Sequence, residues 1–252
     1  MRQLYFAMFF SAGLFMSFAH ACQLTVQIMQ FPPLAFKSNQ NQWSGLNVDY
    51  IKALLDKVNC HFEFAESPFA RGLKLLEHGA VDMTVNISKT GTRANHYYFI
   101  GPQRVETIRL VSRKGSLPLV SSWQEMAELE GTLIRQRGAY IGKKVEQIFN
   151  SNDLLDERVM LFTDNEKRIE MIKKNRADGF FIESTYLYYQ LKNNPDYKIL
   201  EVHPIIINEE PVYYAFSKKT TSLEQLKKLK KAFEQLQQTE EFTHIENKYN
   251  QF

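Results

Sequence analysis

Short apolar runs of strand length alternate with segments of helical periodicity along most of this chain, and this alternation restricts the fold more than any other feature. Residues 24–29 and 61–64 are the first two strand-like runs, and between them apolar residues recur at helical spacing over residues 48–58. A strand, a helix and a second strand in succession place the two strands in one sheet as parallel strands, through a right-handed crossover. The sequence therefore predicts an α/β fold built on parallel-rich sheets.

Two such series follow one another along the chain. In the first, a helix is expected to start at Ser67 and Pro68 and to stop at Gly79, and a third strand follows over residues 81–87. An extended stretch at residues 107–111 separates the two series. The second series has expected strands at residues 131–135, 159–162 and 179–182 and expected helices at residues 123–129, 138–149, 166–174 and 186–191. Extended segments follow at residues 205–207 and 212–216, and a last amphipathic helix is expected over residues 223–236.

The first 21 residues differ in composition from the rest of the chain. Arg2 is their only charged residue, an apolar run covers residues 4–19, and Ala19, His20 and Ala21 form the small-residue pattern of a cleavage site. The apolar run is short for a membrane span, which needs about 20 residues. We expect residues 1–21 to be a signal peptide and the mature chain to start at Cys22 in an oxidising compartment.

Cys22 and Cys60 are the only two cysteines, and each stands at the start of a strand-like run. If those strands are parallel neighbours, about 4.8 Å apart, their first residues lie within disulfide reach. A disulfide between Cys22 and Cys60 is therefore expected. The alternative is a lipoprotein in which Cys22 is acylated, although Ala19 is a poor match to the usual Leu of a lipobox and Cys60 would then stay unpaired.

Residues 86–93 gather more hydrogen-bond donors than any other loop of the sequence. They contain three hydroxyls, one amide, a glycine and the guanidinium of Arg93. A guanidinium can donate two parallel hydrogen bonds to a carboxylate, and hydroxyls such as those of Ser88 and Thr90 can fill the remaining lone pairs. The loop also follows an expected strand, where open α/β sheets bind ligands. We expect it to bind a small carboxylate; the alternative is an ordinary turn with an exposed arginine.

Several classes of function have no support in the sequence. The net charge of +3 gives no broad electrostatic case for nucleic acid. There is no G-x-S-x-G motif and no Gly-rich phosphate loop, and the six histidines show no metal-ligand spacing, so no cofactor and no metal are expected. The run of lysines at residues 227–231 is interpreted as the solvated side of the last helix.

A series of short segments, taken in order, resembles the periplasmic solute-binding proteins of extracellular solute-binding family 3, the polar amino-acid receptors of ABC importers. In particular, Thr90, Gly91, Thr92 and Arg93 match the T-x-x-R loop of that family. The other matching segments are residues 31–36, 45–49, 75–82, 98–102, 129–131 with Gly138, and 177–183, and together they cover essentially the whole mature chain.

The resemblance implies a two-lobed periplasmic-binding-protein fold, in which each lobe is a parallel-rich sheet flanked by helices. Lobe one would contain residues 22–105 and 209–252, and lobe two would contain residues 106–208. The two chain crossings between the lobes would form a hinge, and a ligand in the cleft would close it.

The resemblance also assigns roles to residues. Arg93, helped by Ser88 and backbone N–H groups, would bind the α-carboxylate of an amino acid, and Glu183 would bind the α-amino group. Phe31 and Phe69 match the aromatic residues that sandwich the ligand side chain. The loop before an expected helix at Gly138 would add a contact from lobe two, where a helix N-terminus suits an anion. The full set of expected ligand-binding residues is Arg93, Ser88, Thr90, Glu183, Phe31, Phe69, Gly138, Ala139, Tyr140, Arg71 and Trp43.

The chain departs from the family pattern at the side chains that would select the ligand. Ala139 and Tyr140 stand where small hydroxyl residues are usual, and Glu183 is one methylene longer than the common Asp. Three extra cations, Arg71, Arg135 and Arg137, would suit a second carboxylate on the ligand, although Arg71 could equally lie on the solvated face of its helix. Trp43 could line the cleft or serve as a packing residue.

The expected function is therefore binding without catalysis. A monomeric periplasmic protein would bind an amino acid or a related small carboxylate and deliver it to an ABC permease in the inner membrane. One alternative is an enzyme similar to cyclohexadienyl dehydratases, with Glu183 as general acid. Another is a sensory protein that presents its ligand-closed state to a membrane receptor. The sequence does not identify the ligand.

Overall fold

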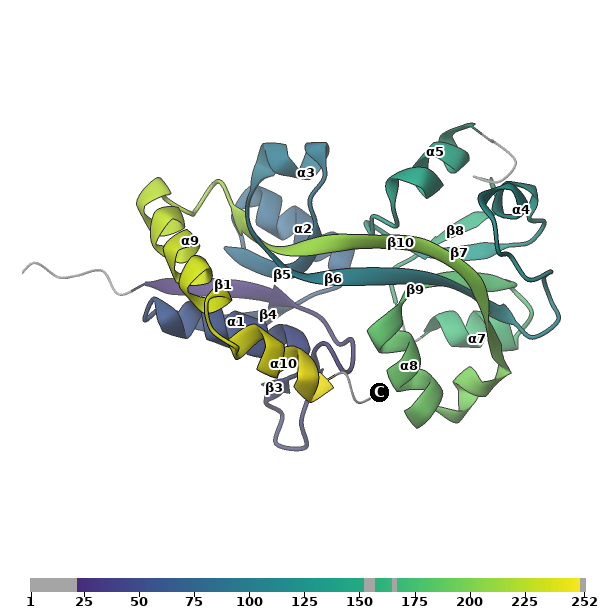
Figure 1. Cartoon of the computed structure of the whole chain (residues 1–252), viewed down its shortest axis with the longest axis horizontal. Coiled ribbons are helices and arrows are strands. Elements are labelled where there is room, and N and C mark those ends of the chain that lie inside the picture. The colour runs from purple at the N-terminus through teal and green to yellow at the C-terminus, as the bar shows by residue number, and fades with distance from the viewer. Residues whose placement is uncertain (1–21, 152–156, 165–166, 250–252) are drawn as a thin grey trace, which may run out of the picture.

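The structure is a computed structural model that describes residues 22–151, 157–164 and 167–249. The expected signal peptide at residues 1–21 lies outside the described residues. The described chain forms two lobes, which the long strands β6 (Tyr97–Arg113) and β10 (Leu200–Ser217) connect (Figure 1).

One sheet of eight strands runs through both lobes in the order β4-β1-β5-β10-β6-β9-β7-β8. In lobe one, β1 pairs in parallel with β4 and β5, and in lobe two, β7 pairs in parallel with β8 and β9. The crossing strands β6 and β10 pair antiparallel with each other, and they join the two parallel groups through β5 and β9. The remaining strands of this sheet are β1 (Gln23–Ile28), β4 (His61–Glu66), β5 (Met83–Ser88), β7 (Leu133–Gln136), β8 (Val159–Phe162) and β9 (Gly179–Glu183). The predicted α/β fold with parallel-rich sheets is confirmed.

Helices flank the strands of each lobe (Figure 1). Lobe one carries α1 (Leu46–Lys57), α2 (Phe69–His78), α3 (Gly91–His96), α9 (Leu223–Gln237) and α10 (Glu241–Tyr249), together with a small hairpin of β2 (Phe36–Lys37) and β3 (Trp43–Ser44). Lobe two carries α4 (Trp123–Glu128), α5 (Lys143–Ser151), α7 (Lys167–Lys173), α8 (Ser184–Asn193) and the short 3-10 helix η1 (Pro195–Ile199).

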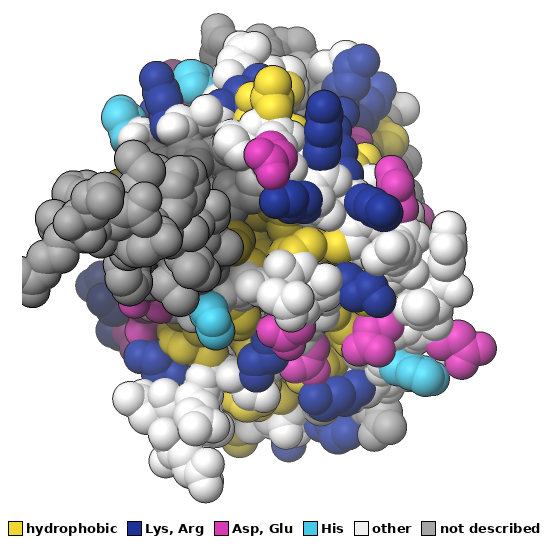
Figure 2. Space-filling view, turned by 90° about the vertical axis from the view of Figure 1, so that its left-hand side faces the viewer, with side chains coloured by type: hydrophobic (Ala, Val, Ile, Leu, Met, Phe, Trp, Pro, Cys, Tyr) yellow, Lys and Arg dark blue, Asp and Glu magenta, His cyan; other side chains and the backbone are white. Residues whose placement is uncertain are grey.

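The last long helix shows why the periodic pattern is informative. In α9, Leu229 and Phe233 are buried one turn apart, and Phe233 lies edge-on against Tyr214 of β10. The lysines at residues 227, 228, 230 and 231 lie on the exposed side of the same helix, as predicted. On the face shown in Figure 2, basic and acidic side chains are interspersed, with no broad area of one sign.

The predicted disulfide is confirmed. Because β1 and β4 are parallel neighbours with Gln23 opposite His61, the preceding residues Cys22 and Cys60 face each other with their Cα atoms 4.6 Å apart, and their sulfurs are bonded. The bond closes a loop with a sequence separation of 38 residues. It lies at the amino ends of these strands, at the opposite end from the ligand cleft described below.

The expected extended stretches 107–111, 205–207 and 212–216 prove to be parts of two much longer strands of 17 and 18 residues. Pro204 and Pro211 both lie within β10, although proline has no N–H group to donate to a sheet ladder. At Pro204 the ladder shifts register between Val202 and Ile206. The predicted lobe boundaries at residues 105/106 and 208/209 fall inside these two strands and stay a prediction.

Two helix predictions need correction. Residues 91–93, expected as the end of a loop, belong to the short helix α3 (Gly91–His96), whose first turn is capped by the Thr90 hydroxyl accepting a hydrogen bond from the Arg93 N–H group. Residues 138–142, expected to open a helix, are not helical, and α5 begins at Lys143. Gly138 and Gly142 have φ values of 81° and 113°, which a right-handed helix does not allow. Helix α10 was not predicted.

Candidate functional site

A cavity of about 100 Å³ lies between the two lobes. Lobe one lines it with the carboxyl ends of β1 and β5 and with the first residue of α2. Lobe two lines it with β9 and with the loop after β7, and the crossing strand β6 runs between them. The predicted ligand-binding residues that line the cavity are Phe31, Phe69, Ser88, Arg93, Ala139, Tyr140 and Glu183.

Arg93 of α3 connects the two lobes across the cleft. Its Nη1 donates to the Ser88 carbonyl oxygen at 2.8 Å, and its Nη2 donates to the Gly138 carbonyl oxygen of lobe two at 2.9 Å. Burial lowers the pKa of this guanidinium, because charge is costly away from water. No described carboxylate forms an ion pair with Arg93, which lines the cavity.

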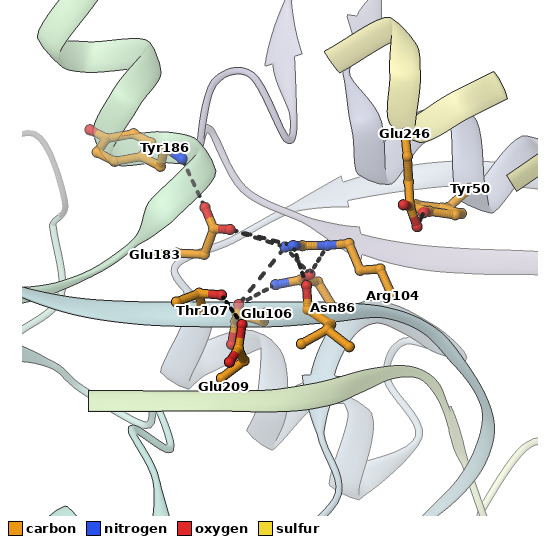
Figure 3. Close-up of polar contacts among 10 residues, drawn as sticks. Tyr50, Asn86, Arg104, Glu106, Thr107, Glu183, Tyr186, Glu209 and Glu246 are labelled. Carbon is orange, nitrogen blue, oxygen red and sulfur yellow. Dashed lines mark hydrogen bonds and ion pairs between the residues drawn. The ribbon is translucent and has the colours of Figure 1, made fainter. Parts of the chain in front are cut away.

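Four polar residues meet at the floor of the cleft, where β5, β6 and β9 converge (Figure 3). The Asn86 carboxamide lies between Arg104 and Glu106. Its Oδ1 accepts from Arg104 Nη2 at 2.6 Å and from Arg104 Nε at 3.1 Å, and its Nδ2 donates to Glu106 Oε2 at 2.8 Å. Arg104 also donates to Glu183 Oε1 at 3.4 Å, which links lobe one to lobe two.

The two carboxylates of this group, Glu183 and Glu106, have different hydrogen-bond partners. Glu183 is the N-cap of α8, where its Oε2 accepts from the Tyr186 backbone N–H group at 2.8 Å. Glu106 is 9% exposed, and burial raises the pKa of its carboxyl to about 7. The nearby guanidinium of Arg104 opposes this rise in pKa, and the negative charge of Glu183 adds to it.

An aromatic contact also spans the cleft. Phe31, in the loop after β1, stacks on Tyr186 of α8 with ring centroids 4.1 Å apart and an interplanar angle of 8°. One face of the Phe31 ring is thus covered by lobe two. Phe69, the other residue of the expected aromatic sandwich, lines the same cavity from the start of α2.

Two predicted residues lie away from the cavity lining. Trp43 packs against Phe64 with ring centroids 6.1 Å apart, and the Lys37 ammonium lies 5.2 Å from the centroid of the Trp43 ring. Arg71 is exposed on α2, which corresponds to the alternative that it belongs to the solvated face of its helix.

The other extra cations and the remaining loop residues also lie outside the cavity lining. Arg135 donates to the Ala139 carbonyl oxygen at 2.8 Å and pairs with Glu146 of α5, while Arg137 is exposed. Thr90 caps α3, and Gly138 contributes only the carbonyl that accepts from Arg93. None of the three cations Arg71, Arg135 and Arg137 lines the cavity. None of them is therefore placed to bind a second carboxylate of a ligand.

The sequence interpretation missed several polar residues of the cleft. Glu106 and Arg104 belong to the crossing strand, where they alternate with outward-facing Val105, and this alternation is the only signal that could have marked them. Arg168 of α7 lines the cavity and is 2% exposed. Its Nη1 donates to the Phe181 carbonyl oxygen at 2.9 Å, and burial lowers the pKa of its guanidinium. Among the described residues, no group of three or more His, Cys, Asp or Glu side chains is arranged to hold a metal ion.

Solved structures share this architecture. A histidine kinase sensor domain with similarity to periplasmic binding proteins superposes with a TM-score of 0.76 at 16% identity, covering 91% of this chain and 96% of that one. The substrate-binding protein AbpA of an amino acid ABC transporter from Streptococcus pneumoniae, bound to L-arginine, superposes with a TM-score of 0.73 at 20% identity, covering 90% and 94%. An ancestral amino acid-binding protein, AncCDT-1, a precursor of cyclohexadienyl dehydratase, superposes with a TM-score of 0.71 at 19% identity, covering 90% and 95%. At these identities the likeness establishes the fold.

Sequence comparison establishes the family. No curated protein sequence matches the chain. The sequence profile of the bacterial extracellular solute-binding proteins, family 3, matches residues 24–252, which is nearly the whole chain after the expected signal peptide. The two lobes, the two crossing strands and the cleft between them have the architecture of the solved relatives. The chain belongs to the bacterial extracellular solute-binding proteins, family 3.

Proposed function

We propose that the protein binds a small amino acid in the cleft between its lobes and delivers it to an ABC importer. The observation that carries this proposal is Arg93, a partly buried guanidinium that lines the cavity and has no described carboxylate as a partner. A guanidinium has five N–H groups, and the two hydrogen bonds to the Ser88 and Gly138 carbonyls leave donors for a ligand carboxylate.

Hinge closure is the motion that this arrangement supports. Residues 22–105 with 209–252 would move as one body and residues 106–208 as the other, with β6 and β10 bending between them. Contacts that join the bodies directly include the Arg93 bond to Gly138, the Arg104 bond to Glu183 and the Phe31 stack on Tyr186. Because Arg93 belongs to both the ligand site and the contact between lobes, a bound carboxylate would favour the closed state.

The compartment and the partner follow from the family. The family is extracellular, and the disulfide between Cys22 and Cys60 suits an oxidising compartment such as the periplasm. No helix among the described residues combines the length and the apolar character that crossing a bilayer requires. The partner would be the permease of an ABC importer, and the protein would act as a monomer.

Transport and sensing use the same closed clamp, and the likeness to a histidine kinase sensor domain keeps sensing as a second candidate. Deletion of the gene separates the two functions, because uptake of the ligand would fall for a transport protein and stay unchanged for a sensor. Catalysis by Glu183 has less support, since both of its oxygens already accept hydrogen bonds from the protein. Failure to form an aromatic product from prephenate or arogenate would remove that alternative.

A thermal-shift screen of the standard L-α-amino acids and small organic acids tests the proposed function. A ligand that binds only the folded state raises the melting temperature, by an amount that grows with the logarithm of the ligand concentration relative to Kd. We expect at least one amino acid to stabilise the wild-type protein and to lose this effect in Arg93→Ala. Arg71→Ala, which removes an exposed arginine from a neighbouring helix, is the matched control.

A further inference from the structure

His203 of β10 is a buried histidine, 1% exposed, that does not line the ligand cavity and uses both of its ring nitrogens. Its Nδ1 accepts from the backbone N–H group of Val120 at 3.0 Å. Its Nε2 lies 3.0 Å from the Ser112 hydroxyl of β6, and this hydroxyl donates to Glu201 Oε1 at 3.2 Å. Because a backbone N–H group can only donate, Nδ1 carries a lone pair and the ring proton is on Nε2. These contacts therefore require a neutral imidazole in one defined tautomer.

The contact with Val120 lies where the crossing strand β10 leaves its partner β6. The register shift of β10 surrounds Pro204, which has no N–H group to donate. At this gap the strand pairs with Val120, in the loop between β6 and α4. Ile205 donates its N–H group to the Val120 carbonyl oxygen at 3.1 Å, and Val120 donates its own N–H group to His203. The imidazole thus supplies one of the two backbone contacts that attach the loop to the strand.

This loop, residues 114–121, also contributes to the core of lobe two. Val120 and Leu117 are buried, and they belong to the same hydrophobic cluster as Met126 of α4 and Ile205 of β10. Separation of Val120 from β10 would expose apolar surface that this cluster buries, which has a cost in free energy. The state of the imidazole therefore affects more than one hydrogen bond.

The surroundings of His203 favour its neutral form. Burial lowers the pKa of the imidazole, and the negative charge of Glu201, on the same strand, opposes this fall. The Glu201 carboxylate accepts from the Ser112 hydroxyl and from the Gly115 N–H group at 2.9 Å, so the serine lies between the carboxylate and the ring.

Charged groups of the neighbouring elements have other surroundings. On β6, Arg113 points to the face opposite to that of the serine which contacts the ring. In the loop, Lys114 is exposed. Asp178, which precedes β9, and Glu125 of α4 each accept a hydrogen bond from a backbone N–H group. Among the described residues, no carboxylate forms an ion pair with the ring that would stabilise its protonated form.

We propose that His203 is a pH-sensitive switch, which attaches loop 114–121 to the crossing strand β10 while its imidazole is neutral and releases the loop when the ring is protonated. Protonation places a hydrogen on Nδ1, so that two donors, Nδ1–H and the Val120 N–H group, face each other. It also places a charge in a buried position, which is costly without a partner. The loop then opens locally while the rest of the fold persists. This switch is independent of the ligand and of the choice between transport and sensing.

The direction of the pH dependence follows from linkage. The pKa of His203 in the folded protein lies below its ordinary value of 6.5, so the unfolded or opened state binds more protons in this range. The contribution of the switch to stability is fully present above pH 6.5 and is lost as the pH falls through the lower pKa of the folded state. Acid should therefore open the loop, and neutral pH should close it.

Two substitutions separate the two contacts of the ring, and neither replacement titrates. His203→Asn places an amide oxygen near the position of Nδ1, where it can accept from Val120 at every pH. His203→Gln places its amide near the position of Nε2 and leaves the Val120 N–H group without its acceptor. His61→Gln, which removes an exposed histidine at the start of β4, is the matched control.

Hydrogen exchange of the Val120 amide measures the opening, when it is followed by NMR without ligand and corrected for the intrinsic exchange rate at each pH. In the wild-type protein and in His61→Gln, we expect protection of this amide to fall about tenfold between about pH 7.5 and about pH 5. In His203→Asn the protection should stay high and nearly constant over this range. In His203→Gln it should be low at both pH values.

Each result supports or overturns the switch. Constant protection of the Val120 amide in the wild-type protein would overturn it, and so would wild-type protection in His203→Gln at about pH 7.5. A His203→Asn variant that keeps the wild-type response to pH would assign that response to another group. If neither variant folds, the ring nitrogens of wild-type His203 decide by NMR. A proton on Nε2 at neutral pH is expected, and a proton on Nδ1 would contradict the contact with Val120.

Discussion

Phe31 and Tyr186 lie face to face across the cleft, with ring centroids 4.1 Å apart and ring planes 8° from parallel. Phe31 comes from the loop after β1 of lobe one, and Tyr186 from α8 of lobe two. Tyr186 is itself fixed, because it is 2% exposed and packs edge-on against Tyr197. The stack therefore joins a loop of one lobe to a rigid helix of the other, and together with the Arg93 bond to Gly138 it holds the lobes together.

Removal of this stack should open the unliganded protein. An aromatic pair stabilises a contact by about 0.5–1.5 kcal/mol beyond the area that it buries. Phe31→Ala should therefore shift the population of unliganded molecules toward the open form. We expect a larger radius of gyration from small-angle scattering without ligand, and little change in melting temperature. Phe36→Ala, in the small hairpin outside the cleft, is the control. Identical scattering from Phe31→Ala and wild type would show that the stack does not hold the lobes.

Loss of the disulfide should lower stability and spare binding. In the chain-entropy model, a cross-link with a separation of 38 residues contributes about 4 kcal/mol. Replacing Cys22 and Cys60 together by serine should lower the free energy of unfolding by about that amount in urea titrations. The ligand affinity should stay unchanged, because the bond lies at the amino ends of β1 and β4 while the cleft is at the carboxyl ends. A large loss of affinity in the folded variant would mean that the bond supports the cleft.

Glu106 should make folding stability depend on pH in a defined direction. Its pKa in the folded protein is about 7, above the ordinary value of 4.5, so the folded state binds more protons than the unfolded state between these values. Its contribution is fully present below pH 4.5 and is lost as the pH rises through 7. The expected size is at most roughly 3 kcal/mol.

Glu106→Gln tests this dependence, since glutamine does not ionise. The variant should gain stability relative to wild type as the pH rises from 5 to 8, when both are measured without ligand by urea unfolding. A stability difference that stays constant over this range would show that Glu106 titrates at its ordinary pKa of 4.5.

The regular parts of the fold could be predicted because they depend on local pattern. Apolar periodicity located the strands and helices, and the strand–helix–strand rule placed β1 beside β4, which brought Cys22 and Cys60 together. The long strands were recognised only in fragments. Pairing between β6 and β10 carries the backbone through Pro102 and Pro204, which local rules interpret as breaks.

The cleft floor could not be predicted, because it depends on contacts between distant residues. Asn86 and Arg104 are 18 residues apart, and Arg104 and Glu183 are 79 apart. The partners of the two nearby acids are set by the N-cap role of Glu183 and by the amide of Asn86, which donates to Glu106. The ion pair of Arg135 with Glu146 could not be predicted either. The position of Arg135 beside a predicted cleft loop gave no sign of this partner.

The central claim is that Arg93 binds the carboxylate of the ligand. Losing a charge-assisted, two-bond contact in a closed cleft costs on the order of 2–5 kcal/mol, so Arg93→Ala should bind at least about 30-fold more weakly while it stays folded. Isothermal titration calorimetry with the amino acid that most stabilises the wild-type protein measures this, with Arg71→Ala as the control that should bind normally. We predict loss of binding in Arg93→Ala alone; an affinity of Arg93→Ala within threefold of wild type would contradict the assignment of Arg93 to the ligand carboxylate.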